Sequence, residues 1–481
     1  MKSLELKPNK EILLETLESD TIGRNIELTR FIRLLHDIEG NFSIAIDNDW
    51  GTGKTFFVKQ AKMILDAYNE HSYDYEQYNS ERIRNIVEKY IEYKKAVENK
   101  NISLYLAVYY NAWENDNQKS PLLSLIYEII KVAKIDTNET DISINKEKII
   151  KDGLSAIVKH FSGIDIKELL DYVKAKDKDI FKEIKEQKSI KEQVDNILNN
   201  LLLEHGERLV IFIDELDRCR PTFAVELLEQ IKHYFDNDKI TFVFSTNIKQ
   251  LQYTIKKYYG EAFEAKRYLD KFFDLIIILN DFNLEKYFNF MKFNEDDIDD
   301  IYEIICKKII KIYNLNLRDI LKFYQITRIA IENKRYIYNN FKDKNNMTNK
   351  FLMYYFLPII IALKIKDYNQ YENFIAGKNY KCINNLLMDK DIIEYLKVLL
   401  CLGKNFKLES SVVRKNLILI YKAIFVEQYI DKSSIKIGEL DNSENLIAAL
   451  KEVLGSTIKK NMNIDTVMDM LREADLDEQT K

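Results

Sequence analysis

The stretch "IAIDNDWGTGKTFFVKQ", residues 44–60, decides the fold that we expect for this chain. It begins with the apolar run 44–46, passes through polar residues and two glycines, and continues after Lys54 with the periodicity of a helix. A loop that wraps a phosphate group must turn its N–H groups inward, and glycine allows the positive φ angles and the close approach that this requires. The order of strand, glycine loop and helix therefore predicts a phosphate-binding loop.

This loop has an expected role for each of its residues. Its backbone and the first helical turn would bind a nucleoside triphosphate through Asp49, Trp50, Gly51, Thr52, Gly53, Lys54, Thr55 and Phe56. Lys54 would place a positive charge near the β and γ phosphates, and the Thr55 hydroxyl would bind Mg²⁺. The pattern G-x-x-x-x-G-K-[ST] has glycine where this chain has Asn48, a residue type that tolerates left-handed angles, so we expect the loop to form. A chance GKT in a surface turn would explain neither the strand nor the helix around it.

A second motif is "LVIFIDELDRCR", residues 209–220. The apolar run 209–213 predicts a strand of a parallel sheet that is covered on both faces. Asp214, at the end of that strand, would hold Mg²⁺ through water, and Glu215 would polarise the water that attacks the γ-phosphate. An acidic pair after a strand is also common as a helix cap or a solvated turn, but the phosphate loop itself calls for such a pair.

Two further apolar runs extend the predicted sheet. "ITFVFSTN", residues 240–247, follows a helical pattern and completes a βαβ unit, and "ISLYLAVYYNAW", residues 102–113, predicts another strand. Asn247 would orient the water or sense the γ-phosphate, or it is simply a turn former. Trp113 is expected to pack in the core.

Together, "DWGTGKT", "YYNAWEN" at 109–115 and "VIFIDELDRCRP" resemble the KAP family of P-loop NTPases, relatives of the STAND switch ATPases. The resemblance extends over residues 20–335 and includes "NLNLRDILKF" at 314–323 as a helical-lid segment. It implies an ATPase core that uses ATP and Mg²⁺ in the cytoplasm, with a role in signalling or, in bacteria, in the exclusion of phage. It also places "TIGRNIEL", residues 21–28, near the adenine.

The same resemblance suggests roles for three arginines. Arg318 begins the lid segment and would reach the γ-phosphate in a closed state, whereas Arg267 would act on the nucleotide of a neighbouring subunit. Arg218 lies in the acidic motif and would pair with Asp217. For each arginine the alternative is an ordinary salt bridge. The residues expected to serve catalysis are thus Lys54, Glu215, Asn247, Arg318 and Arg267.

The predicted fold is α/β, a P-loop core with a parallel sheet flanked by helices. We assign residues 1–280 to the core, with helical insertions at about 66–100 and 120–200, because Lys54 and Asp214 are 214 − 54 = 160 positions apart, more than one crossover needs. Residues 281–340 would form the helical lid and 351–481 an all-α C-terminal domain, joined by a polar linker at 339–350.

Composition limits the classes of partner. The net charge of −5 does not favour nucleic acid, and the lysines alternate with acids as on solvated helix faces, so nucleic-acid contact is possible but not indicated. The four cysteines lack metal-ligand spacing, which suggests free thiols in a reducing, cytoplasmic compartment. The N-terminus does not predict a signal peptide. The apolar run 351–363 is too short to cross a bilayer, so we expect a buried core helix there and no integral membrane segment.

The sequence therefore predicts an ATP-binding and ATP-hydrolysing switch that is slow or stimulated by a partner. The partner would be a second copy of the chain or a separately encoded effector, since no toxic or nuclease motif is visible. Two alternatives stay open at this point: a scaffold that binds the nucleotide without turnover, and a P-loop phosphotransferase.

Overall fold

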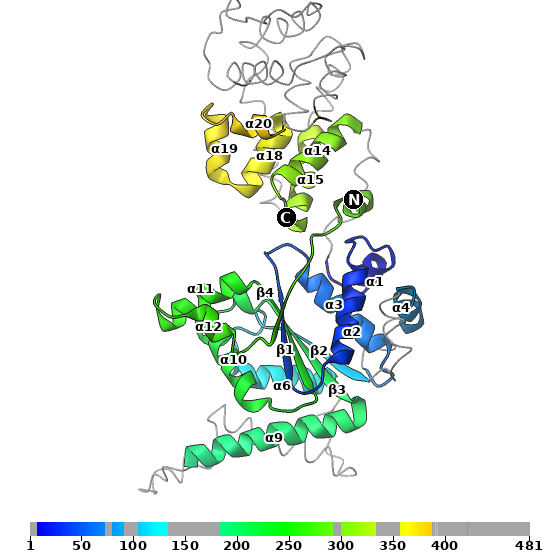
Figure 1. The fold of residues 1–481 in the computed structure, drawn as a ribbon, viewed down its shortest axis with the longest axis vertical. Helices are drawn as coiled ribbons and strands as arrows, with labels where there is room; N and C mark the ends of the chain where they lie inside the picture. Colours follow the sequence, from blue (N-terminus) through cyan, green and yellow to red (C-terminus); the bar gives the residue numbers. More distant parts are fainter. Residues whose placement is uncertain are drawn as a thin grey trace, which may run out of the picture. The chain divides into compact units, whose positions relative to one another are not determined.

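The computed structural model describes residues 7–72, 79–90, 104–132, 182–291, 300–332 and 356–386, with the single residues 390, 392 and 421. The chain forms two compact units, one that spans Leu6–Tyr287 and one that contains the helices after Phe288 (Figure 1). The predicted linker at 339–350 lies outside the described residues, as do most of the insertion at 120–200 and most of the predicted C-terminal domain. The predicted domain boundaries stay predictions.

The first unit is built on a five-stranded sheet in the order β2-β3-β4-β1-β5, and every neighbouring pair runs parallel. The strands are β1 (Phe42–Asp47), β2 (Tyr105–Asn111), β3 (Arg208–Asp214), β4 (Ile240–Thr246) and β5 (Leu275–Ile278). The predicted α/β fold class is confirmed. Each apolar run that was expected to join the sheet contributes a strand to it. Because the strands are parallel, the ends of β1, β3 and β4 meet at one edge, where the phosphate loop and the acidic motif follow their strands.

Helices cover both faces of this sheet (Figure 1). Tyr109 and Tyr110 show the alternation, since Lys59 lies over the Tyr109 ring on one face and the Tyr110 hydroxyl meets Ser124 on the other. The first face carries α1 (Lys10–Glu18), α2 (Asn25–Asp37), α3 (Lys54–Ala67) and α4 (Ser80–Val87). The second face carries α6 (Pro121–Val132), α9 (Lys182–His205), α10 (Pro221–Tyr234) and α11 (Ile248–Tyr259).

The described ends of the predicted insertion belong to the core of the first unit. α6 buries its leucines and isoleucines against β2, and the C-terminal half of α9 buries Val194, Leu198 and Leu201 in the same cluster. Their apolar faces therefore complete the cover of the sheet. Residues 133–181 of the predicted insertion lie outside the described part of the chain.

The remaining helices follow β4 along the chain. They are α12 (Ala265–Leu269), α13 (Leu284–Met291), α14 (Asp300–Ile312), α15 (Leu317–Glu332), α18 (Leu357–Lys366), α19 (Tyr368–Ile375) and α20 (Lys381–Leu386). In the second unit α18 packs against α14, α15 and α19, and its residues from Leu357 to Leu363 are all buried. This part of the apolar run is thus a core helix, as expected. Among the described residues, none of the helices has both the length and the apolarity needed to span a bilayer.

Candidate functional site

The phosphate loop, residues 48–53, leads from the end of β1 into α3. Gly51 and Gly53 have φ angles of 78° and 90°, the left-handed region in which a Cβ is disfavoured. Gly53 directly precedes α3, and no side chain caps that helix. The N–H groups of its first turn and the positive end of its dipole are therefore directed toward the loop, which suits an anion.

Asn48 fits the loop for a different reason from the one that its residue type suggested. It does not have a positive φ angle, so the expectation of left-handed angles was wrong. Its side-chain amide instead donates to the Leu279 carbonyl at 3.0 Å, and its Oδ1 accepts the Asp49 N–H at 2.7 Å. Asn48 thus joins the end of β1 to the residue that follows β5, a contact that glycine cannot make.

The Lys54 side chain bridges two carbonyl groups of the phosphate loop. Its ammonium group donates to the Asn48 carbonyl at 2.5 Å and to the Asp49 carbonyl at 3.0 Å. Burial lowers the Lys54 pKa, and the nearby Asp217 and Asp214 carboxylates oppose that shift. The lysine charge is therefore held inside the loop, close to the acids that follow β3.

Arg24, the residue just before α2, is hydrogen-bonded to the loop and was not among the residues predicted from the sequence. Its guanidinium donates to the Thr52 carbonyl at 2.7 Å and to the Asn280 carbonyl at 2.5 Å, and the residue is only 6% exposed. Burial lowers its pKa, with Glu27 acting in the opposite direction. The segment 21–28 therefore meets the phosphate loop through this arginine. An arginine within a short motif ahead of the loop was the available signal.

Asp214 ends β3 with both carboxylate oxygens engaged. The Tyr109 hydroxyl donates to Oδ2 at 2.9 Å, and the Glu215 backbone N–H donates to Oδ1 at 3.0 Å. The residue is 2% exposed. The carboxylate is therefore fixed in orientation, while each oxygen keeps a lone pair for a further ligand.

Glu215 occupies a strained backbone position, with a φ angle of 61° in a residue other than glycine. Its carboxylate pairs with Arg218 at 2.8 Å. Burial raises the Glu215 pKa, and Arg218 opposes that shift. A raised pKa favours a group that accepts a proton. The expected pairing of Arg218 with Asp217 was wrong, because the turn after Glu215 brings residues three apart onto one side.

Asp217 is instead the point where three segments meet. Its Oδ2 accepts the Trp50 indole N–H at 2.5 Å, and its Oδ1 accepts the Thr246 hydroxyl at 3.0 Å. The residue is 7% exposed. The phosphate loop, the end of β4 and the turn after β3 are thus joined by one carboxylate, a role that sequence spacing does not reveal.

Trp113 does not pack in the core, and that expectation was wrong. Its side chain is 52% exposed, and the Arg218 guanidinium lies 5.5 Å from its ring centre. β2 ends at Asn111, so Trp113 lies in the turn beyond the sheet edge rather than under a helix. The indole packs on a cation instead.

Asn247 caps a helix and also contacts the phosphate loop, and its role toward the γ-phosphate stays a prediction. Its Oδ1 caps α11 by accepting the Gln250 N–H at 3.1 Å, and its Nδ2 donates to Asp49 of the phosphate loop at 3.3 Å. The residue therefore lies between β4 and the loop, with its amide directed at the loop.

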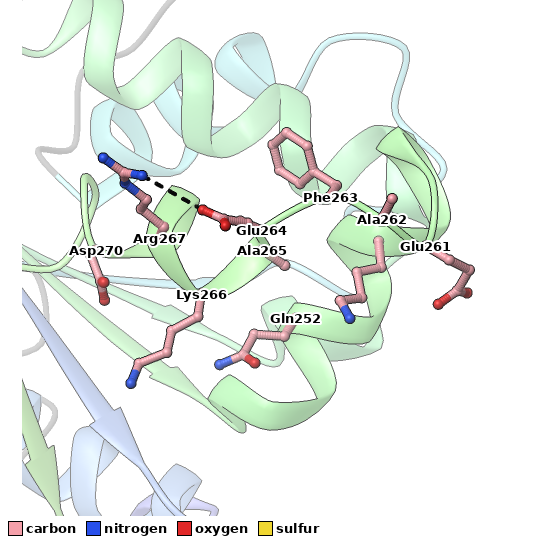
Figure 2. Close-up of a pocket in the computed structure, with 10 residues that line it drawn as sticks. Gln252, Glu261, Ala262, Phe263, Glu264, Ala265, Lys266, Arg267 and Asp270 are labelled. Atoms are coloured by element: carbon pink, nitrogen blue, oxygen red, sulfur yellow. Dashed lines mark ion pairs between the residues drawn. The ribbon is translucent and has the colours of Figure 1, made fainter.

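Arg267 and Arg318, the two predicted arginines after β4, have no described contact with the phosphate loop. Arg267 on α12 is largely exposed and pairs with Glu264 at 3.7 Å, on the wall of an open pocket of about 560 Å³ (Figure 2). Arg318 is exposed in the first turn of α15, in the second unit. Their proposed roles stay predictions.

The donor set fits Mg²⁺ bound to a nucleotide. Among the described residues there is no group of three or more His, Cys, Asp or Glu side chains that could hold a metal alone. Mg²⁺ usually takes one or two carboxylates together with phosphate oxygens and water, and Asp214 with the Thr55 hydroxyl can supply such a partial set. Thr55 is half-buried in the first turn of α3, and Asp214 ends β3 at the same sheet edge.

Comparison with known proteins agrees with this geometry. The uncharacterized protein MJ0182 of Methanocaldococcus jannaschii is 28% identical over 165 residues, which cover 27% of this chain and 84% of that protein. The family model described as the KAP family P-loop domain matches residues 25–331, close to the predicted extent. Because that match covers more than half of the chain, and its sheet, phosphate loop and acidic strand are all formed, the protein belongs to the KAP family of P-loop NTPases.

Proposed function

We propose that this protein binds Mg·ATP in the phosphate loop and hydrolyses it slowly, as a switch. The observation that carries the proposal is the arrangement at one sheet edge, where the loop with Gly51 and Gly53 at positive φ lies beside two acids of unlike environment. Asp214 is fixed by donors and suits a metal, whereas burial raises the pKa of Glu215, which suits proton transfer.

The proposed mechanism assigns each group one task. The loop N–H groups and Lys54 stabilise charge on the β and γ phosphates, and Thr55 with Asp214 would hold Mg²⁺, which neutralises phosphate charge when bound. Glu215 orients the attacking water and accepts its proton. Asn247 reports the γ-phosphate through its amide, which in this structure donates to Asp49.

The arginines and the partner belong to the switching part of the proposal. Arg318 would approach the γ-phosphate when the lid closes, and Arg267 would serve the nucleotide of a second copy of the chain. The alternative partner is a separately encoded effector. Cytoplasmic action in bacterial signalling or phage exclusion rests on the family resemblance alone.

The first test is phosphate release by the purified protein with Mg·ATP, compared with Glu215→Gln and Lys54→Ala. We expect turnover to fall by at least about a hundredfold in both variants. Glu215→Gln should still bind ATP, whereas Lys54→Ala should bind it weakly. Asp238→Asn, at an exposed acid of the same unit, is the control that should leave turnover unchanged.

Other outcomes would favour the alternatives. Tight binding by the wild type with no phosphate release in any condition indicates a nucleotide-binding scaffold. ATP consumption without free phosphate, accompanied by a phosphorylated acceptor, indicates a phosphotransferase.

A further inference from the structure

The strand β2 supplies side chains to the acidic edge that the proposed mechanism does not use. The Tyr109 hydroxyl donates to Asp214 Oδ2 at 2.9 Å, opposite the Glu215 N–H that donates to Oδ1. With a donor on each oxygen, the carboxylate cannot rotate about its Cβ–Cγ bond without breaking a hydrogen bond. The Tyr109 hydroxyl therefore helps to decide where the free lone pairs of Asp214 point.

The sheet register fixes the Tyr109 side chain in this place. Tyr109 pairs with Phe212 and Asn111 with Asp214 in the parallel ladder, so Tyr109 and Asn111 share one face. On that face the Lys59 ammonium of α3 lies 4.5 Å from the centre of the Tyr109 ring. The ring is therefore held against α3, and the hydroxyl reaches the end of β3.

Tyr109 can act toward Asp214 only as a donor. Its hydroxyl lies 2.9 Å from Asp214 Oδ2 and carries the proton of this hydrogen bond. An ionised carboxylate can only accept hydrogen bonds. The direction of this hydrogen bond is therefore fixed.

Asn111, the next residue on that face, has a different set of contacts. Its Oδ1 accepts the backbone N–H groups of Trp113 at 3.1 Å and Glu114 at 3.3 Å. Asn111 thus orders the turn beyond β2, whereas Tyr109 is hydrogen-bonded to the acid at the end of β3.

We propose that Tyr109 is a positioning residue for the metal-binding carboxylate. Tyr109 orients Asp214 toward Mg²⁺ bound with ATP, without touching the nucleotide itself. This inference rests on the proposed function. It predicts that loss of the Tyr109 hydroxyl weakens Mg²⁺ binding and leaves the binding of metal-free ATP unchanged.

The test is Tyr109→Phe, which removes one hydroxyl and keeps the ring beneath Lys59. ATP binding is measured by calorimetry in EDTA and across a Mg²⁺ titration. We expect unchanged binding in EDTA and an apparent Mg²⁺ affinity lowered by about tenfold, as is usual when an outer partner of a metal ligand is lost. Saturating Mg²⁺ should restore turnover.

A comparison variant separates this role from general damage. Tyr110→Phe also removes a tyrosine hydroxyl with a hydrogen bond, but on the opposite face at Ser124, and should leave the Mg²⁺ titration unchanged. Thermal unfolding without nucleotide checks that each variant is folded.

A double-mutant cycle completes the experiment. If Tyr109 acts through Asp214, then Tyr109→Phe should have no further effect on Mg²⁺ binding in an Asp214→Asn background. An unchanged Mg²⁺ midpoint in Tyr109→Phe, or an equal shift in Tyr110→Phe, overturns the positioning role while the proposed function stands. A wild type that binds ATP equally with and without Mg²⁺ overturns both the metal assignment and this inference.

Discussion

Replacing Asp217 by asparagine tests whether one carboxylate holds the site together. In the wild type its two oxygens accept different donors, Trp50 Nε1 at 2.5 Å and Thr246 Oγ1 at 3.0 Å. An asparagine has one oxygen and no charge: if that oxygen keeps the Trp50 indole N–H, the Thr246 hydroxyl faces the NH₂ group and must reverse its role and accept, so both hydrogen bonds lose their charged acceptor. Hydrogen bonds to a charged acceptor contribute about 1.5–3 kcal/mol each, and relief from burying the charge offsets part of the loss. We therefore expect a loss of about 2 kcal/mol in the free energy of unfolding.

The measurement is thermal unfolding without nucleotide, where 2 kcal/mol corresponds to a decrease in Tm of about 3–4 °C for a unit the size of Leu6–Tyr287. Asp238→Asn makes the same chemical change at an exposed acid and should stay within about 0.5 kcal/mol of the wild type. Trp50→Phe removes a single donor and should cost part of the full effect. If Asp217→Asn unfolds at the same temperature as Asp238→Asn, the three segments are not held by this carboxylate.

Three further predictions concern the same unit. Burial raises the Glu215 pKa above the value of about 4.3 in an unfolded chain, so the folded state binds that proton more tightly. Its contribution to stability therefore falls as pH rises from about 4 through the raised pKa. The pH dependence of Tm should weaken in Glu215→Gln, and the rising limb of wild-type turnover should lie above the pKa of an ordinary glutamate, whereas matching pH profiles would contradict the assignment. Gly23→Ala should lower the unfolding free energy more than Gly40→Ala. Both glycines have left-handed φ angles, but only at Gly23 would an added Cβ lie 2.4 Å from the Asn283 Cβ. Equal unfolding midpoints would argue against that close approach. Arg24→Met removes the two hydrogen bonds that hold the loop and the segment after β5. ATP affinity measured by calorimetry should fall about tenfold, which is the equivalent of one charged hydrogen bond. Undiminished affinity would show that the loop keeps its shape without Arg24.

Strands β3 and β4 could be predicted from the sequence because they are buried on both faces. Runs such as 209–213 and 240–246 contain almost only apolar and β-branched residues, and few other structures accommodate them. The glycine conformations followed equally directly, since the loop needs positive φ angles that other residues resist. Both inferences depend on local sequence alone.

The contacts among side chains at the site could not be predicted in the same way. Arg218 was expected beside its neighbour Asp217, but the left-handed Glu215 turns the chain so that Arg218 meets Glu215. The Asp217 carboxylate joins residues that are 167 and 29 positions away, Trp50 and Thr246. Such contacts depend on which strands become neighbours, and the hydrophobic periodicity of a sequence does not indicate the strand order.

The Trp113 prediction failed for a related reason. Tryptophan is usually buried, and the run before it is a buried strand, but the strand ends two residues earlier. Whether a residue just beyond a strand end is covered depends on elements elsewhere in the chain. Here a guanidinium, rather than a helix, is its partner.

The placement of the two indoles also means that the intrinsic tryptophan fluorescence of the protein reports on its site. Trp50 and Trp113 are the only tryptophans in the chain, and they are 43% and 52% exposed. One is hydrogen-bonded to Asp217 and the other packs on Arg218, so both touch the turn that follows Glu215. Any rearrangement of that turn alters the polarity around an indole, and the emission spectrum of the unlabelled protein will record it without interference from other tryptophans.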